Sequence, residues 1–340
     1  MFSKFMDPTN LEKSSGTERQ SRPKIIYQIH YAPHGTPEDQ RGLHELIHQA
    51  DIYIPEGFGN SALSKIMYNA ISQGRKTPEE ATQQMIGSEF SETSLGELNS
   101  LYGTKIPVTF IDIPAYDNLF IEGEPTLSLS VGNIDELFQS VRSYLMKISE
   151  SDKRREQHML DQLKPMVDTT LDEYPELKAK KQLRVLLSLG SFHTRIYHEL
   201  QKSGQDVVRE FGEMPPVYSL HDEAERRMIF NKPVSDELVS QVLLEIILDD
   251  FYRDQMQGLC KGSTKISRYI RLVASSFTLD EIRNFILGFV PLANLANITT
   301  FTQVEPLRKG LDFFLKEKGI SIPTTEKELD SLLDQLSKKH

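Results

Sequence analysis

Short apolar runs and helix-spaced apolar residues alternate along the first two thirds of the chain. Residues 24–32 (KIIYQIHYA) and 183–190 (LRVLLSLG) are apolar stretches bounded by Pro33 and Gly190, which is typical of buried strands. Three further runs are predicted to be strands: 51–57, 105–114 and 206–211. Helical patterns separate these runs, at 37–50, 61–102, 134–148, 152–171 and 191–204. This alternation predicts an α/β domain with a mostly parallel sheet and flanking helices.

The first two predicted strands enclose a helix with one apolar face. Thr36 followed by Pro37 is typical of an N-cap and a first helical residue. The apolar face repeats at i, i+3, i+4 and i+7 and consists of Leu43, Leu46, Ile47 and Ala50. Because the connections on both sides of the helix are short, we expect a βαβ unit that contains a parallel pair of strands.

The pattern changes after Pro215 and Pro216, and helical patterns dominate beyond them. The predicted helices are 236–256, 263–274, 280–289, 306–318 and 326–338. Three Thr-x-x-Glu sequences are predicted to be capping boxes: Thr77 with Glu80, Thr278 with Glu281, and Thr325 with Glu328. We therefore expect a disordered tail over residues 1–22, an α/β domain over 23–215 and an all-helical domain over 216–340.

Composition narrows the classes of protein to which the chain can belong. Its 340 residues, 26% of them charged and 38% apolar, suit a globular protein of about two domains. A net charge of −10 argues against a nucleic-acid partner. The single Cys260 excludes an internal disulfide and a cysteine-rich zinc site. No signal peptide is visible, and the longest apolar run (285–296) is short and contains Pro291. We therefore expect a cytoplasmic protein without a membrane span.

Residues 44–48 (HELIH) match the pattern H-E-x-x-H of zinc peptidases. Two histidines four residues apart on a helix can share a zinc ion, and the glutamate between them can activate water. However, His44 and His48 lie about 100° around the helix from its apolar stripe, so they are expected on a flank of the helix. A strand follows at once, and no obvious third ligand on a helix comes after it. A zinc peptidase centred on His44, Glu45 and His48 is therefore kept as an alternative.

Polar residues with catalytic potential stand where the predicted strands end. Four strands deliver such residues to their carboxyl ends: His30 and His34, Glu56, Asp112, and His193. The carboxyl ends of parallel strands meet at one edge of a sheet, where α/β proteins bind their ligands. We therefore expect these side chains to converge on one crevice.

The first part of the chain resembles the superfamily of erythromycin esterase, ChaN, TraB and Tiki proteins. Its members begin with a strand, a histidine-containing turn such as THGT, a helix and a strand that ends in glutamate. The corresponding segment here is APHGTPEDQRGLHELIHQADIYIPEG, which contains His34 and Glu56. The family's glycine before the first histidine is absent, since the strand reads YQIH up to His30. The family histidine therefore corresponds either to His30 or to His34, and the Gly-Thr that follows favours His34.

Three later segments extend the resemblance over residues 24–211. FIDIP is similar to the family strand that ends in an acidic residue, here Asp112. KRREQHMLDQL resembles the family's R-[DE]-x-x-M helix, which places Arg155 and Glu156 before a methionine. LRVLLSLGSFHTRIYHELQKSG resembles the final strand and helix, with His193 after the strand.

The resemblance implies a hydrolase, of esterase or metal-dependent protease type, that acts on a small molecule or a peptide. It implies a site built from His34, Glu56 and His193, with the substrate-binding residues His30, Asp112 and Arg155 around it. The same His34, Glu56 and His193 could hold one divalent ion such as manganese, cobalt or zinc. Since the family also includes haem binders, a non-catalytic module that binds a haem-type ligand in the same crevice is an alternative.

Overall fold

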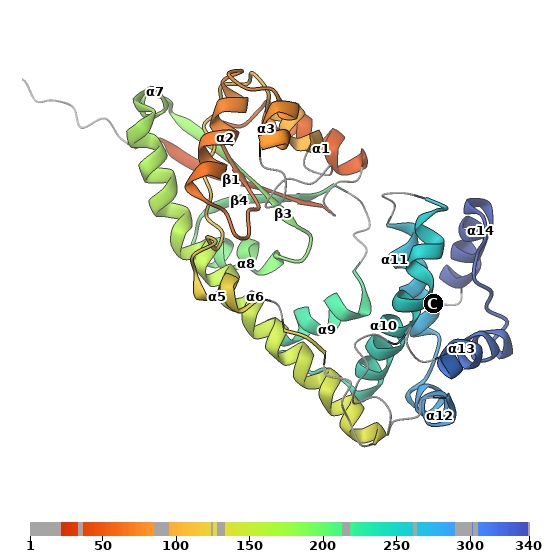
Figure 1. Ribbon diagram of the computed structural model, residues 1–340. Helices are drawn as coiled ribbons and strands as arrows, with labels where there is room; N and C mark the ends of the chain where they lie inside the picture. The colour runs from red at the N-terminus through yellow and green to blue at the C-terminus, as the bar shows by residue number, and fades with distance from the viewer. Residues whose placement is uncertain are drawn as a thin grey trace, which may run out of the picture.

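The protein has a sheet lobe and a helical lobe that are joined by one long helix, α6 (Figure 1). The computed structural model describes residues 22–32, 37–84, 95–123, 125–127, 133–212, 218–260, 264–289, 301 and 305–338. The predicted tail over 1–22 lies outside the described residues, apart from Arg22. Parallel strands with flanking helices, followed by helices toward the C-terminus, confirm the predicted fold class.

Four parallel strands form the sheet, in the order β2-β3-β1-β4. They are β1 (Lys24–Ala32), β2 (Ile52–Pro55), β3 (Gln182–Gly190) and β4 (Asp206–Phe211). The first two strands are parallel, as predicted, but they are not neighbours, because β3 lies between them. This position suits β3, since its residues 185–189 are all buried and a central strand is covered on both faces. Because β2 and β3 are neighbouring parallel strands, their carboxyl ends lie side by side.

The prediction of a strand at 105–114 is wrong. This segment runs beside β2, but it forms isolated bridges instead of a continuous ladder, one between Val108 and Tyr53 and one between Pro114 and Asn60. Tyr53 donates its N–H to the carbonyl of Pro107, and Thr109 donates to the carbonyl of Tyr53. The next donor from β2 in a parallel ladder would be residue 55, which is a proline without an N–H. The ladder therefore stops after one bridge.

The side chain of Asn69, on α2, binds this segment through Val108, whose backbone groups take no part in the bridge to Tyr53. Its amide accepts the N–H of Val108 at 3.0 Å and donates to the carbonyl of Val108 at 2.8 Å. The segment that carries Asp112 is thus fixed by a side chain as well as by the sheet.

We expect Asn69→Ala to lower the free energy of unfolding by about 2 kcal/mol, because both backbone groups of the buried Val108 lose their partner. Urea denaturation measures the change. Asn69→Asp, which can accept from Val108 but cannot donate to it, is the control and should fall between the wild type and the alanine variant. A wild-type stability for Asn69→Ala would show that the amide does not support this segment.

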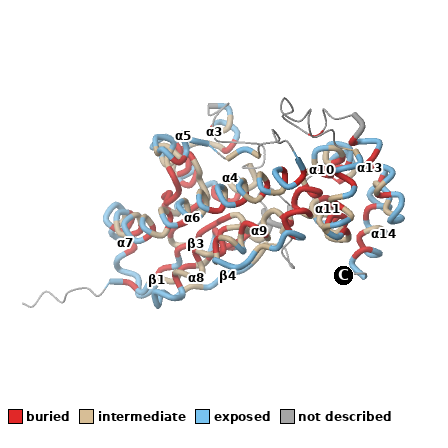
Figure 2. Tube along the Cα trace, turned by 90° about the horizontal axis from the view of Figure 1, so that it is seen from below, coloured by how far each residue is buried: buried red, intermediate tan, exposed pale blue. Residues whose placement is uncertain are grey.

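Helices cover both faces of the sheet (Figures 1 and 2). On one face lie α1 (Pro37–Ile47), α2 (Ala62–Ser72), α3 (Pro78–Gln84) and α4 (Leu95–Leu101), which share a core with Tyr53 and Leu186. The other face packs on the second half of α6, on α7 (Pro175–Lys178) and on α8 (Thr194–Lys202). The alternating side chains of the strands therefore feed two separate cores.

A single helix, α6 (Ile134–Glu173), replaces the two helices predicted at 134–148 and 152–171. The sequence between them, Ser149-Glu150-Ser151, contains neither proline nor glycine, and Ser149 turns its hydroxyl to the carbonyl of Met146 within the helix. The first half of α6 packs in the helical core, and the second half packs on the sheet. The helical core thus includes residues that precede 215, and the domain boundary there stays a prediction.

The helical lobe surrounds α10 (Asp236–Gln257), in which eleven residues are buried. The other helices after the sheet are α9 (Leu220–Ile229), α11 (Lys265–Ser275), α12 (Leu279–Phe289), α13 (Glu305–Glu317) and α14 (Glu326–Ser337). Among the described helices, none is both long and apolar enough to cross a membrane.

The predicted capping boxes are borne out to different extents. Both reciprocal hydrogen bonds form between Thr77 and Glu80 and between Thr278 and Glu281, so these two boxes are confirmed. Thr325 accepts from the N–H of Glu328, but the Glu328 carboxylate accepts from Thr324 instead. The helix start there is correct, and the carboxylate reaches one residue further back.

Candidate active site

Four of the six predicted site residues lie together at the carboxyl edge of the sheet. Glu56 directly follows β2, His193 follows β3, Asp112 lies in the extended segment beside β2, and Arg155 reaches in from α6. His34, with the turn around it, lies outside the described residues. Glu56, Asp112 and His193 therefore converge as expected. The positively charged Arg155 that joins them comes from a helix, α6.

Arg155 binds two carboxylates at once. Its Nη2 lies 2.7 Å from Oε1 of Glu56 and 2.6 Å from Oδ2 of Asp112, and its Nε donates to Oδ1 of Asp112 at 2.9 Å. The backbone N–H groups of Gly57 and Ile113 also donate to Asp112, whose side chain is 1% exposed. Burial opposes the charge of Arg155, but hydrogen bonds and attraction to both carboxylates raise the pKa of the guanidinium above its usual value. Asp112 is thus the anchor of Arg155 and is sealed from solvent.

His193 stands between two glutamates. Its Nε2 lies 3.3 Å from Oε1 of Glu56, and its Nδ1 lies 3.4 Å from Oε1 of Glu156. The hydroxyl of Tyr31 donates to the carbonyl of His193 at 3.0 Å, which helps fix the backbone of the turn after β3. Oε2 of Glu56 in turn accepts the N–H of Gly190, so the same turn holds both partners.

Glu156 is a site residue to which the sequence reasoning assigned no role. It is fully buried on α6, where it shares the inward stripe with Met159, Leu163 and Val167. A glutamate at the head of an otherwise apolar helical stripe is the signal that could have identified it, since buried carboxylates are paired. Its partners are His193 and, at 4.0 Å, Arg195.

The two glutamates keep His193 charged. Burial of the ring opposes the charge, but the carboxylates of Glu56 and Glu156 outweigh it and raise the pKa of His193 to about 10. At neutral pH the ring is therefore an imidazolium with both nitrogens protonated. It can hold or stabilise negative charge, but it cannot act as the general base that a histidine of ordinary pKa could be.

The raised pKa of His193 predicts a pH-dependent stability. The unfolded chain loses the proton near pH 6.5 and the folded protein only near pH 10, so the stabilising contribution is complete below pH 6.5 and is lost as the pH rises toward 10. Over this window the free energy of unfolding should fall by up to about 1.4 kcal/mol per pH unit because of this group. Urea denaturation between pH 6.5 and 9.5 measures the slope. In His193→Gln the slope should be shallower by that amount, whereas equal slopes would contradict a charged ring.

His30 is buried in the sheet, but it faces different neighbours. Its Nδ1 lies 3.8 Å from Oε1 of Glu210 on β4, and Gly42 of α1 lies against its ring. Strand β3 separates its strand from β2, after which Glu56 follows. A substrate-binding role for His30 stays a prediction.

The histidines of the H-E-x-x-H pattern point to solvent. Leu43, Leu46 and Ile47 are buried, which confirms the predicted apolar face of α1, while His44 and His48 are exposed and their rings meet edge to face with centroids 4.6 Å apart. Across the described ranges, no group of three or more histidine, cysteine, aspartate or glutamate side chains is arranged to hold a metal ion.

The described part of the site does not fit a divalent ion. Glu56 and Asp112 already hold the guanidinium of Arg155, which would repel a second cation. The ligand set predicted for a metal, His34, Glu56 and His193, includes one residue outside the described ranges and stays a prediction.

The loop after Glu56 forms an aromatic wall beside Arg155. The guanidinium carbon of Arg155 lies 4.7 Å from the ring centroid of Phe58, and Phe58 packs on Phe120 at 5.1 Å. Gly59 has φ +76°, and a Cβ there would come within 2.2 Å of the Phe120 ring, so the loop requires glycine at this position. The charged residues thus have an apolar surface next to them.

No family model, curated protein or solved structure matches the chain. The residues of the site are therefore the basis for assigning a function.

Proposed function

We propose that the protein is a hydrolase of the esterase type, whose site is the cluster of Glu56, Arg155, His193, Asp112 and Glu156. The observation that carries the proposal is the graded exposure of this cluster. The side chains of Glu56 and Arg155 are 18% and 14% exposed, whereas those of His193, Asp112 and Glu156 are 3% exposed or less. The Glu56 carboxylate and the Arg155 guanidinium are thus partly exposed side by side, and their contacts with buried charged residues fix their positions.

Glu56 and Arg155 are the groups that meet the substrate in this proposal. Glu56 takes a proton from a water molecule as that water attacks the substrate carbonyl, and it gives this proton to the alcohol oxygen when the tetrahedral intermediate collapses and the ester C–O bond breaks. Arg155 stabilises the negative charge that develops on the carbonyl oxygen, and its fixed contacts with Asp112 mean that it need not reorganise during the reaction. The Phe58 ring under the guanidinium excludes water from one side of it.

His193 and Glu156 are positioning residues in the proposed mechanism. The imidazolium holds Oε1 of Glu56 while the Gly190 N–H holds Oε2, so the carboxylate is fixed at both oxygens. Glu156 neutralises the far side of the ring from within the protein. The resemblance to the erythromycin esterase, ChaN, TraB and Tiki superfamily supports the proposal, because four residues assigned through it are the ones that converge.

A panel of esters, amides and phosphoesters tests the proposal with purified protein. We expect the wild type to cleave at least one ester, and His44→Ala to cleave it equally well, since His44 lies on the exposed flank of α1. Loss of activity only in His44→Ala would move the active site to the H-E-x-x-H helix. Absence of cleavage by the wild type, with and without added manganese, cobalt or zinc, would favour the alternative of a non-catalytic binding module in the same crevice.

A further inference from the structure

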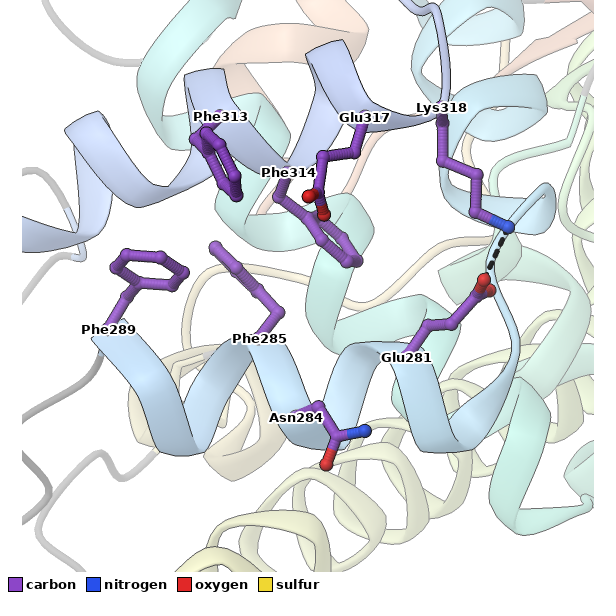
Figure 3. Close-up of a pocket in the computed structure, with 8 residues that line it drawn as sticks. All are labelled: Glu281, Asn284, Phe285, Phe289, Phe313, Phe314, Glu317 and Lys318. Atoms are coloured by element: carbon purple, nitrogen blue, oxygen red, sulfur yellow. Dashed lines mark ion pairs between the residues drawn. The ribbon is translucent and has the colours of Figure 1, made fainter.

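A large cavity lies between α12 and α13, far in sequence from the candidate active site (Figure 3). It has a volume of about 610 Å³, which is within the usual range for small-molecule sites. Four phenylalanines line it: Phe285 and Phe289 from α12, and Phe313 and Phe314 from α13. One of these rings, Phe313, is 56% exposed. Exposed apolar side chains that are grouped together often mark a binding site.

Packing fixes the aromatic walls of the cavity. Phe314 is stacked between Phe285 and Phe277, with centroid distances of 4.6 and 4.3 Å and interplanar angles of 15° and 23°. Phe289 stands against Gly310 of α13, where a Cβ would come within 2.2 Å of the ring. Phe285, Phe289 and Phe314 are therefore held in place by their neighbours before any ligand arrives, and little ordering of these three rings is left for binding.

The polar groups of the cavity carry more negative than positive charge. Glu281 and Glu317 contribute two carboxylates, and Lys318 contributes one ammonium group, which pairs with Glu281 at 2.5 Å. No hydrogen bond or ion pair joins the Glu317 side chain to another described residue, and Figure 3 shows this side chain extending from α13 toward the cavity. Within the described part of the chain, one carboxylate thus has no cation paired with it beside the rings.

Aromatic faces and a carboxylate both attract cations. The faces of phenylalanine rings carry negative electrostatic potential and bind ammonium groups within about 6 Å of the centroid. The cavity region already contains one such contact, since Nζ of Lys318 lies 5.4 Å from the centroid of Phe277. An anionic ligand would meet Glu317 and is disfavoured.

We propose that the cavity between α12 and α13 binds a small organic ammonium ion with an aromatic or apolar body. The apolar body packs among Phe285, Phe289 and Phe313, and the ammonium group lies toward Glu317 at the α13 wall. This site is independent of the proposed hydrolase activity, and each can hold without the other.

Calorimetric titration with three ligands of one shape tests the proposal: phenethylamine as the cation, 2-phenylethanol as the neutral form and phenylacetate as the anion. We expect phenethylamine to bind about tenfold more tightly than 2-phenylethanol, and phenylacetate to bind most weakly. Glu317→Gln should remove most of the preference for the amine while leaving the affinity for the alcohol unchanged. Phe313→Ala should weaken both, because it removes apolar contact.

Asp334→Asn is the matched control, since it removes an exposed carboxylate from α14, outside the cavity. It should bind all three ligands as the wild type does. Equal affinity for amine and alcohol, or no saturable binding of the amine up to about 10 mM, would overturn the proposal. So would binding of the amine that neither Glu317→Gln nor Phe313→Ala changes. Thermal unfolding of each variant shows whether it is folded when it is titrated.

Discussion

Glu56→Gln is expected to lower the rate of ester hydrolysis by about 10²–10⁴-fold, the usual effect of removing a general base. The amide keeps the size of the side chain and can still accept the Gly190 N–H, but it has no charge and takes no proton from water. Arg155 remains paired with Asp112, so the variant should stay folded. Steady-state kinetics on the best ester of the panel, together with the circular dichroism spectrum, measures both effects.

Glu45→Gln is the matched control for this variant. It makes the same chemical change at an exposed glutamate of α1, in the middle of the H-E-x-x-H pattern. We expect wild-type kinetics from it. Full activity in Glu56→Gln would remove Glu56 from the mechanism, and loss of activity in Glu45→Gln instead would make the peptidase pattern the active site.

Asp112→Ala is expected to lower the free energy of unfolding by about 3–5 kcal/mol, as is typical when one partner of a buried ion pair is removed. The substitution leaves the buried part of Arg155 without its anchor and also removes the acceptor of the Gly57 and Ile113 N–H groups. Urea denaturation measures the difference from the wild type. The esterase activity should fall as well, since Arg155 loses the contacts that hold it in place.

Asp236→Ala provides a comparison with the same ion-pair distance. Asp236 and Arg142 are also 2.6 Å apart, but the Asp236 side chain is 80% exposed, against 1% for Asp112. An exposed pair of this kind contributes about 0–1 kcal/mol. Similar losses of stability in the two variants would show that burial is not what makes the Asp112 contact strong.

The strands and the place of the site could be predicted from local patterns, but the strand order could not. Apolar runs mark all four strands, and the residues that follow two of them lead to Glu56 and His193, while Asp112 belongs to the run at 105–114, which is not a strand. That β3 lies between β1 and β2 depends on pairing between distant segments, which no local pattern reports. The failed strand at 105–114 depends on Pro55, a residue in another segment, because its missing N–H ends the ladder.

The charge of His193 could not be predicted from the sequence, because it depends on residues that only the fold brings together. An isolated histidine is assigned an ordinary pKa, and it takes Glu156 from α6 and Glu56 from β2 to turn His193 into an imidazolium. Glu156 lies on α6, which is continuous over residues 134–173 and not divided at 149–151 as the sequence predicts. The role of His193 therefore changes from a possible base to a fixed cation.

The charge state of His193 tests most directly the central claim that buried charges hold Glu56 in place. The imidazolium lies between Glu56 and Glu156 and contacts both. In ¹⁵N-histidine-labelled protein, the His193→Gln variant identifies its signals among the nine histidines. At pH 8 we expect both ring nitrogens of His193 to carry protons, with a titration midpoint at about 10. A ring that is singly protonated at pH 8 and titrates near 6.5 would contradict the account, since Glu56 and Glu156 would then not hold it as a cation.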